Sequence, residues 1–288
     1  MVSVGSSMDG NAAIHMKRTI LSIDPGIVQI GIAIGVFSVQ SSSFWQEMPI
    51  EQITEVDLMN RHVHWRFCKT LNLIELVNQC DQSRCSLHHT NEMVDRVNHL
   101  VQYFPVFHTV DLILIERQQP GACTDVQNLL MNCLARNKIV LISPASRNKY
   151  LGATKAVVFG TKEERRWQRK VMTVQRVLKW MSPWTFLSKN DQVNDGDESI
   201  VHELRFLDFV HAHHDAADAA FFIAMYCKQT LWPQWMEQVQ QQKKETSNMH
   251  FMEEEYSDDS FEEEAEAIIT AETSLDDYFN NYEHKAKS

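Results

Sequence analysis

Four acidic residues stand out by the sequence around them. Asp24 and Glu116 each end a strongly apolar run, Ile-Leu-Ser-Ile-Asp and Leu-Ile-Leu-Ile-Glu, and Asp215 and Asp218 open an alanine-rich helical stretch. A carboxylate in apolar surroundings is costly unless it is paired or binds a cation. Because three separate segments deliver these acids, we expect them to converge on one metal site.

This set of residues suits phosphodiester chemistry with Mg²⁺ or Mn²⁺, which carboxylates hold well. Two such ions, about 3.5–4 Å apart, activate a water and stabilise the departing oxygen. We expect Asp24 to bridge the two ions and Glu116 to flank it from a neighbouring strand. Asp215 and Asp218 are three residues apart and so share a helix face, and a place in the first turn would suit their charge. Taken singly, each acid could instead be a cap or turn residue, Asp215 for example an N-cap.

The hydrophobic pattern predicts the elements that position these acids. Strands are expected at about 19–24, 28–37, 43–50, 111–116 and 139–144. Helices are expected over most of 56–104, from Asp125 to about 136, at 163–181, and from Asp215 to about 228, with a polar loop at 188–200. Three strands followed by alternating helix and strand indicate an α/β domain with a mixed five-stranded sheet flanked by helices. That is the order of an RNase H-like fold.

Composition suggests how the chain is divided. We expect a flexible leader at 1–17, a nuclease domain at 18–237 with a helical insertion at about 52–110, and a disordered acidic tail at 238–288. The net charge of −11 belongs to that tail, because residues 243–288 hold 14 acids against 4 Lys and Arg, whereas residues 1–242 hold 24 acids against 23 bases.

The compartment is only partly constrained. The sequence has no apolar run long enough to span a bilayer and no signal peptide, so we expect a soluble, intracellular protein. Its six scattered cysteines favour reduced thiols. A nucleus, a viral factory and a mitochondrion are not distinguished by these features.

Residues 147–179 form a strongly basic segment, with ten Lys and Arg against two acids. Such an excess is typical of a surface that binds a polyanion, although it could also be a solvated helix face. From this segment and the residues after Glu116 we expect DNA contacts. The expected DNA-binding residues are Arg117, Gln118, Gln119, Lys155, Lys162, Arg165, Arg166, Arg169, Lys170 and His214. Gln118 and Gln119 could equally be ordinary loop residues, and His214 a structural histidine.

Four motifs, in this order, carry a family resemblance. They are Ile23-Asp24-Pro25-Gly26 with Gly31 five residues on, Ile115-Glu116-Arg117-Gln118, Ile142-Ser143-Pro144, and His214-Asp215-Ala216-Ala217-Asp218-Ala219. Together they resemble the motifs of RuvC-like Holliday junction resolvases, particularly the fungal mitochondrial and large-DNA-virus branches. The chain departs from these branches in its longer segments 52–110 and 182–213, and in having His213 and His214 where lysines are common.

The resemblance implies a homodimeric crossover junction endodeoxyribonuclease that uses two Mg²⁺ or Mn²⁺ ions to nick a four-way DNA junction symmetrically. Asp24, Glu116, Asp215 and Asp218 would be its catalytic metal ligands, and the enzyme would act in DNA recombination, replication, repair or genome processing. Two alternatives stay open at this point. One is another RNase H-like nuclease, acting on flaps or RNA–DNA hybrids, and the other is a non-catalytic adaptor that binds branched DNA.

Two further patterns are separate from the acids. Cys80, Cys85, His88 and His89 have the residue types of a zinc site, although their spacing fits no common zinc finger and such loops arise by chance. In the tail, Leu275, Tyr278 and Phe279 would share one face of a helical turn. This segment, 272–279, resembles a PCNA-like sliding-clamp peptide with Glu272 in place of the usual glutamine, and it could also be a chance aromatic pair.

Overall fold

The computed structural model describes residues 15–40, 54–152, 159–181 and 200–257. The chain divides into two compact units, Met1–Trp235 and Met236–Ser288. The expected leader, the strand at 43–50, the polar loop at 188–200 and the clamp-like peptide at 272–279 lie wholly or mostly outside the described residues. No helix in the described ranges is both long enough and apolar enough to cross a membrane.

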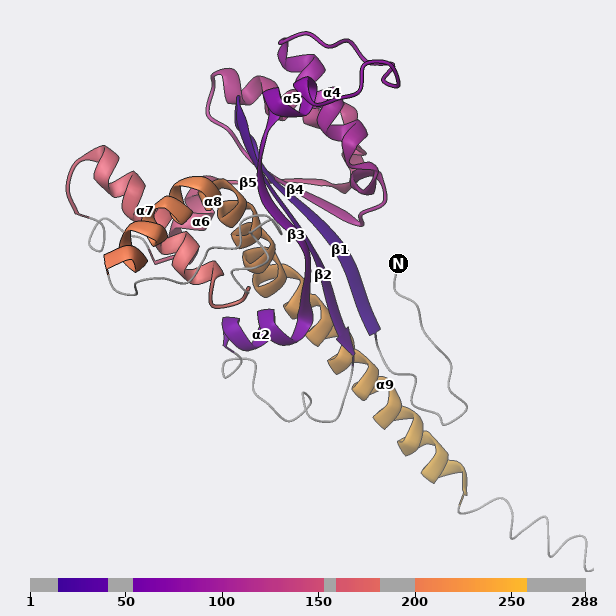
Figure 1. The fold of residues 1–288 in the computed structure, drawn as a ribbon. Helices are drawn as coiled ribbons and strands as arrows, with labels where there is room; N and C mark the ends of the chain where they lie inside the picture. Colours follow the sequence, from indigo (N-terminus) through magenta and orange to yellow (C-terminus); the bar gives the residue numbers. More distant parts are fainter. Residues whose placement is uncertain (1–14, 41–53, 153–158, 182–199, 258–288) are drawn as a thin grey trace, which may run out of the picture. The chain divides into compact units, whose positions relative to one another are not determined.

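The first unit is built on one five-stranded sheet with the order β3-β2-β1-β4-β5 (Figure 1). The strands are β1 (His15–Asp24), β2 (Gln29–Gln40), β3 (Val63–Asn72), β4 (Leu112–Glu116) and β5 (Ile139–Ile142). The first three strands are antiparallel neighbours, while β4 and β5 join in parallel. This mixed sheet confirms the predicted RNase H-like fold class.

The helices of the first unit connect and cover the strands. In chain order they are α2 (Glu55–His62), α3 (Leu73–Asn78), α4 (Met93–Tyr103), α5 (Ala122–Cys133), α6 (Pro144–Tyr150), α7 (Lys162–Val177) and α8 (Ile200–Tyr226). Helix α9 (Trp232–Ser257) begins at the end of the first unit and belongs mostly to the second. The start of α7 is fixed by a capping box, in which Thr161 Oγ1 accepts a hydrogen bond from the Glu164 amide and Glu164 Oε2 accepts one from the Thr161 amide.

Strand β2 explains how the two faces of the sheet differ. Ile30, Ile32 and Ile34 point to one face, where they pack with α4 and α5 in the main apolar core. The positions between them are Gly31, Ala33 and Gly35, which lie on the other face because side chains alternate along a strand. Helix α8 packs on that small-residue face (Figure 1), and its own contact surface is rich in buried alanines.

The prediction for 56–104 was partly wrong. Residues 63–72 form β3, which pairs with β2 along its length. The segment Val-His-Trp-Arg-Phe begins with the alternation of apolar and polar residues typical of a strand, and the helical pattern on either side obscured it. Part of the segment that we expected to be an insertion is therefore a strand of the central sheet.

Two helix boundaries also differ from expectation. Helix α8 begins at Ile200, so Asp215 and Asp218 lie in its interior rather than in its first turn. No Gly or Pro lies between Ile200 and Asp215 to end a helix there, and the predicted dipole effect and N-cap role are therefore wrong. In the second unit, α9 continues to Ser257, beyond residue 238 where the disordered tail was expected to begin, and the disorder of the tail stays a prediction.

Candidate active site

The sheet places two of the four acids side by side. Asp24 is opposite Gly31 on β2, and Gly31 is opposite Thr70 on β3. On the other side of β1, Ile23 pairs with Ile115, the residue before Glu116. Asp24 and Glu116 thus end two adjacent parallel strands at the same edge of the sheet, as the sequence predicts.

Helix α8 brings the other two acids to the same place by a very close approach to β2. A Cβ built on Gly31 would lie 2.0 Å from the backbone oxygen of Asp215, so only glycine fits there. Two bonds from β3 hold this part of the helix: the Ala216 amide donates to Thr70 Oγ1 at 3.2 Å, and the Cys68 thiol donates to the Ala216 carbonyl at 3.4 Å. Gly31 in the first motif is therefore explained by packing.

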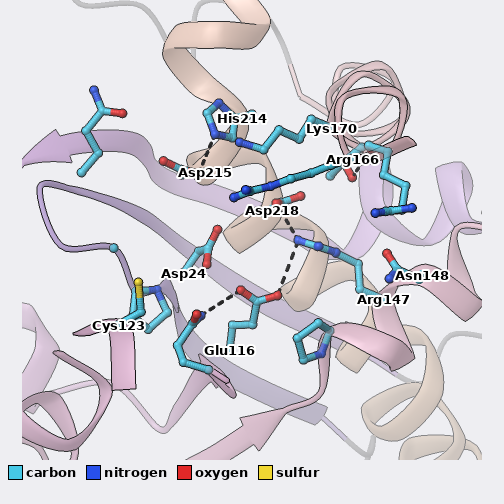
Figure 2. A pocket seen from close by; sticks show the side chains of 17 residues that line it. Asp24, Glu116, Cys123, Arg147, Asn148, Arg166, Lys170, His214, Asp215 and Asp218 are labelled. Atoms are coloured by element: carbon cyan, nitrogen blue, oxygen red, sulfur yellow. Dashed lines mark hydrogen bonds and ion pairs between the residues drawn. The ribbon is translucent and has the colours of Figure 1, made fainter. Parts of the chain in front are cut away.

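All four acids line one cavity of about 490 Å³. Figure 2 shows their carboxylates facing this cavity from the ends of β1 and β4 and from α8. Glu116 and Asp218 are buried, at 7% and 5% exposed. The convergence that the sequence predicts for Asp24, Glu116, Asp215 and Asp218 is thus present in the geometry.

Crowding of negative charge is visible at Asp24. Burial, and next the nearby carboxylate of Glu116, raise the pKa of Asp24 well above its usual value, and Asp218 and Asp215 raise it further. Burial also raises the pKa of Asp218, although the charge of Arg147 opposes that shift. A divalent cation held by these carboxylates would favour the charged forms of Asp24 and Asp218 and so oppose both shifts.

Arg147, on α6, is a site residue that the sequence analysis did not single out. Its Nη1 lies 2.5 Å from Asp218 Oδ2 and 3.6 Å from Glu116 Oε1. Burial lowers the pKa of Arg147, but the charges of Asp218, Glu116 and Asp24 outweigh this and raise it overall. The only feature of the sequence that could have indicated Arg147 is the basic character of segment 147–179. Sequence alone does not distinguish an arginine that pairs with acids from one that faces solvent.

The donor set fits divalent ions. All four acids offer carboxylate oxygens, the ligands that Mg²⁺ and Mn²⁺ prefer. Asp218 Oδ1 is buried and has no hydrogen-bond partner in the part of the chain that the structure describes, whereas Asp218 Oδ2 is held by Arg147. A buried carboxylate oxygen without a partner is costly, and a bound cation would satisfy it.

Two polar neighbours orient the remaining acids. Gln118 Nε2 donates to Glu116 Oε2 at 3.0 Å, and the Gln118 amide donates to Gln127 Oε1 at 2.8 Å. His214 Nε2 lies 2.8 Å from Asp215 Oδ1, while its Nδ1 faces the backbone carbonyls of Val210 and His211, each at 3.1 Å. Gln118 and His214 therefore contact the acids directly, beyond the DNA-contact role predicted for them.

The basic segment has more than one role in the structure. Arg166, Arg169 and Lys170 on α7 line the cavity of the acids, and burial lowers the pKa of Lys170. Arg176, further along α7, instead binds Glu55 on α2 through two bonds of 2.8 and 2.9 Å. The charge of the segment is thus shared between the cavity and internal ion pairs.

The other predicted DNA contacts lie apart from the cavity lining. Arg117, Gln119 and Lys162 are exposed, and Arg165 donates to the Gly160 carbonyl at 2.5 Å. Lys155, and the tail residues Leu275, Tyr278 and Phe279, lie outside the described residues.

Comparison with known proteins gives matches among solved structures only. No protein-family model matches the sequence, and no curated protein matches it. The chain is similar to Thermus thermophilus RuvC in complex with a Holliday junction substrate, with 11% identity and a TM-score of 0.32 over 72% of this chain and 96% of that one. Thermus thermophilus RuvC in a second structure gives 12% identity and a TM-score of 0.33 over the same shares.

The chain is also similar to the yeast mitochondrial Holliday junction resolvase Ydc2. The identity is 15% and the TM-score 0.36, over 80% of this chain and 83% of that one. At such identities the likeness concerns the fold alone. It carries no argument about what this chain does, and the resemblance to RuvC-like resolvases rests on the four motifs.

Proposed function

We propose that this chain is a Mg²⁺- or Mn²⁺-dependent endonuclease that cuts branched DNA, with a four-way junction as its substrate. The observation that carries the proposal is the convergence of Asp24, Glu116, Asp215 and Asp218 in one cavity that three basic side chains of α7 also line. Carboxylates that hold divalent ions next to cations that bind phosphate are the parts that phosphodiester cleavage needs. The motif resemblance to RuvC-like resolvases supports the choice of a branched substrate.

In this proposal the four acids hold the ions. When bound, the ions supply an activated water and stabilise the charge that develops on the phosphodiester. Neighbouring side chains fix the orientation of three of these carboxylates: Arg147 contacts Asp218, Gln118 contacts Glu116, and His214 contacts Asp215. Fixing carboxylates by outer hydrogen bonds in this way is typical of protein metal sites.

The substrate backbone would be held by α7. Arg166, Arg169 and Lys170 face the same cavity as the acids, so a phosphate bound by them lies beside the ions. Because these contacts are mainly electrostatic, junction affinity should fall steeply with salt. We also propose a two-fold dimer, since two equivalent sites would match the two equivalent strands of a four-way junction. Analytical ultracentrifugation of the protein with and without a four-way junction would measure its oligomeric state and test the proposed dimer.

The test is a set of cleavage assays on end-labelled DNA in Mg²⁺. We expect paired, symmetric nicks in a four-way junction and little cutting of linear duplex, flap or RNA–DNA hybrid. Cutting confined to flaps or hybrids would contradict the junction substrate and favour another RNase H-like nuclease. Junction binding that is the same with and without Mg²⁺, with no cleavage of any substrate, would instead favour a non-catalytic adaptor.

A further inference from the structure

Two cysteines and two histidines gather at a second place in the first unit, and none of them lines the cavity of the acids. Cys80, Cys85 and His89 lie in the connection between α3 and α4, and His99 lies on α4. One possible ligand atom from each lies within 4.8 Å of all the others. The sequence pattern predicts His88 in this group, but the structure brings in His99 instead, ten residues beyond His89.

The spacing of the ligand atoms suits one tetrahedral ion. With Zn–S bonds of about 2.3 Å and Zn–N bonds of about 2.0–2.1 Å, neighbouring ligand atoms in a tetrahedron lie about 3.3–3.8 Å apart. Cys85 Sγ and His99 Nε2 are 3.7 Å apart. The four atoms would therefore need only a small contraction of the loop to close around an ion.

His99 is oriented as a metal ligand. Its Nδ1 lies 2.6 Å from the backbone carbonyl of Asp95, and since a carbonyl only accepts, Nδ1 carries the proton. Nε2 of the neutral ring then has its lone pair free, and this is the atom that faces Cys85. A histidine whose other nitrogen donates to a carbonyl is the usual arrangement of metal-binding imidazoles. The ring is 4% exposed, so its position is fixed by packing.

His89 supplies an independent observation. Its Nε2 is buried and has no hydrogen-bond partner within the described residues. The ring lies edge-on to that of His99, with centroids 4.7 Å apart. A buried polar nitrogen without a partner is costly, and a bound ion would supply the missing partner.

The surrounding loop has little else to hold it in place. Between the end of α3 and the start of α4 the described chain forms turns and bends without a helix or strand. Its side-chain bonds are few: Asp81 with Ser83 and Arg84 inside the loop, and Thr90 with Asp95 and Cys85 with Gln102 to α4. An ion shared by the loop and α4 would fasten the loop to a helix that is itself anchored in the apolar core.

We propose that Cys80, Cys85, His89 and His99 bind one structural Zn²⁺ ion. Sulfur and imidazole ligands favour zinc over the hard ions that suit the carboxylate cavity. Four protein ligands leave no open position for water or substrate, which is the pattern of a structural rather than a catalytic zinc site. The site is independent of the proposed nuclease function.

The test uses the full chain, purified without chelator, and measures its zinc content by elemental analysis. We expect about one zinc per chain in the wild type, which is the stoichiometry of one four-ligand site. Cys85→Ser should lose the zinc, whereas the matched control His88→Ala should keep it. Asp24→Asn should also keep it, which separates this site from the candidate active site. Wild type without zinc, or equal loss in Cys85→Ser and His88→Ala, would overturn the proposal.

A second measurement avoids the risk that Cys85→Ser fails to fold. Wild type loaded with Co²⁺ in place of zinc should show visible absorption bands of a tetrahedral ion with thiolate ligands. The mass of the denatured, unreduced chain should correspond to free thiols, as in the structure. A colourless Co²⁺ sample, or a mass that shows a Cys80–Cys85 disulfide, would contradict the zinc site.

Discussion

Replacing Gly31 by alanine should disturb the position of Asp215 more than any other small change in the sheet. The added Cβ would lie 2.0 Å from the Asp215 oxygen, 2.2 Å from its carbonyl carbon and 2.8 Å from the Ala216 nitrogen. All three are backbone atoms, which no rotamer change can move away. Because carbon–oxygen contacts are about 3.3–3.6 Å, α8 must retreat by roughly 1.3 Å at this point.

The variant should lose catalytic rate as well as stability, by similar free energies. A misplacement of about 1 Å can cost about 100-fold in rate, while overpacking costs about 1–3 kcal/mol. We therefore expect Gly31→Ala to lower the single-turnover rate of junction cleavage about 100-fold. Junction affinity, measured in Ca²⁺, should change little, since the basic residues of α7 are untouched.

Gly35→Ala is the matched control on the same strand and the same face. Its added Cβ would meet the Val63 Cγ1 at 3.2 Å and the Ile223 Cγ2 at 3.5 Å, and these side-chain atoms can shift slightly. We expect this variant to keep most of the wild-type rate and melting temperature. A Gly31→Ala protein with the wild-type rate, or a Gly35→Ala protein that loses as much, would refute the role given to this contact.

Three further predictions concern charges. In EDTA, Asp24→Asn should raise the free energy of unfolding by about 0.5–2 kcal/mol, because it removes one of the crowded carboxylates at the expense of function. Calorimetry that shows a destabilised variant would contradict this. Arg147→Met should lower the free energy of unfolding by about 3 kcal/mol because it leaves Asp218 buried without its cation. Added Mg²⁺ should then stabilise the variant more than it stabilises wild type. Equal stabilisation of the two proteins would contradict a site in which Arg147 and Mg²⁺ both neutralise Asp218. Arg169→Ala should weaken junction binding and reduce the slope of log affinity against log salt by about 1, which titrations at several salt concentrations would check. Arg176→Ala should leave binding unchanged but lower the free energy of unfolding by about 3 kcal/mol, because it leaves Glu55 buried without its cation, and melting curves would check this.

The parts of the site that lie on strands were predictable. Asp24 and Glu116 follow continuous apolar runs, which is the pattern of buried parallel strands, and parallel strands end at a common edge. Asp215 and Asp218 are three residues apart on a helix, so the regular geometry of the helix predicts that both lie on one face. Local patterns of this kind depend only on neighbouring residues, so the sequence shows them directly.

Tertiary packing accounts for what the sequence did not predict. Nothing local indicates that Arg147 faces Asp218, because that pair is set by where α6 lies against α8. The start of α8 was misplaced because alanine-rich sequence after Asp215 resembles a helix start, and β3 was missed because helical patterns flank it. The conformation of the loop brings His99 close to Cys80. Sequence spacing does not show this conformation, and it favoured the nearer His88 instead.

We propose above that the four acids hold the ions that cleave junction strands. The most direct test compares wild type with Asp24→Asn on an end-labelled four-way junction in Mg²⁺, with binding measured in parallel in Ca²⁺. We expect paired nicks by wild type and none by the variant, although both proteins should bind the junction with similar affinity. Equal cutting by the two proteins would contradict it.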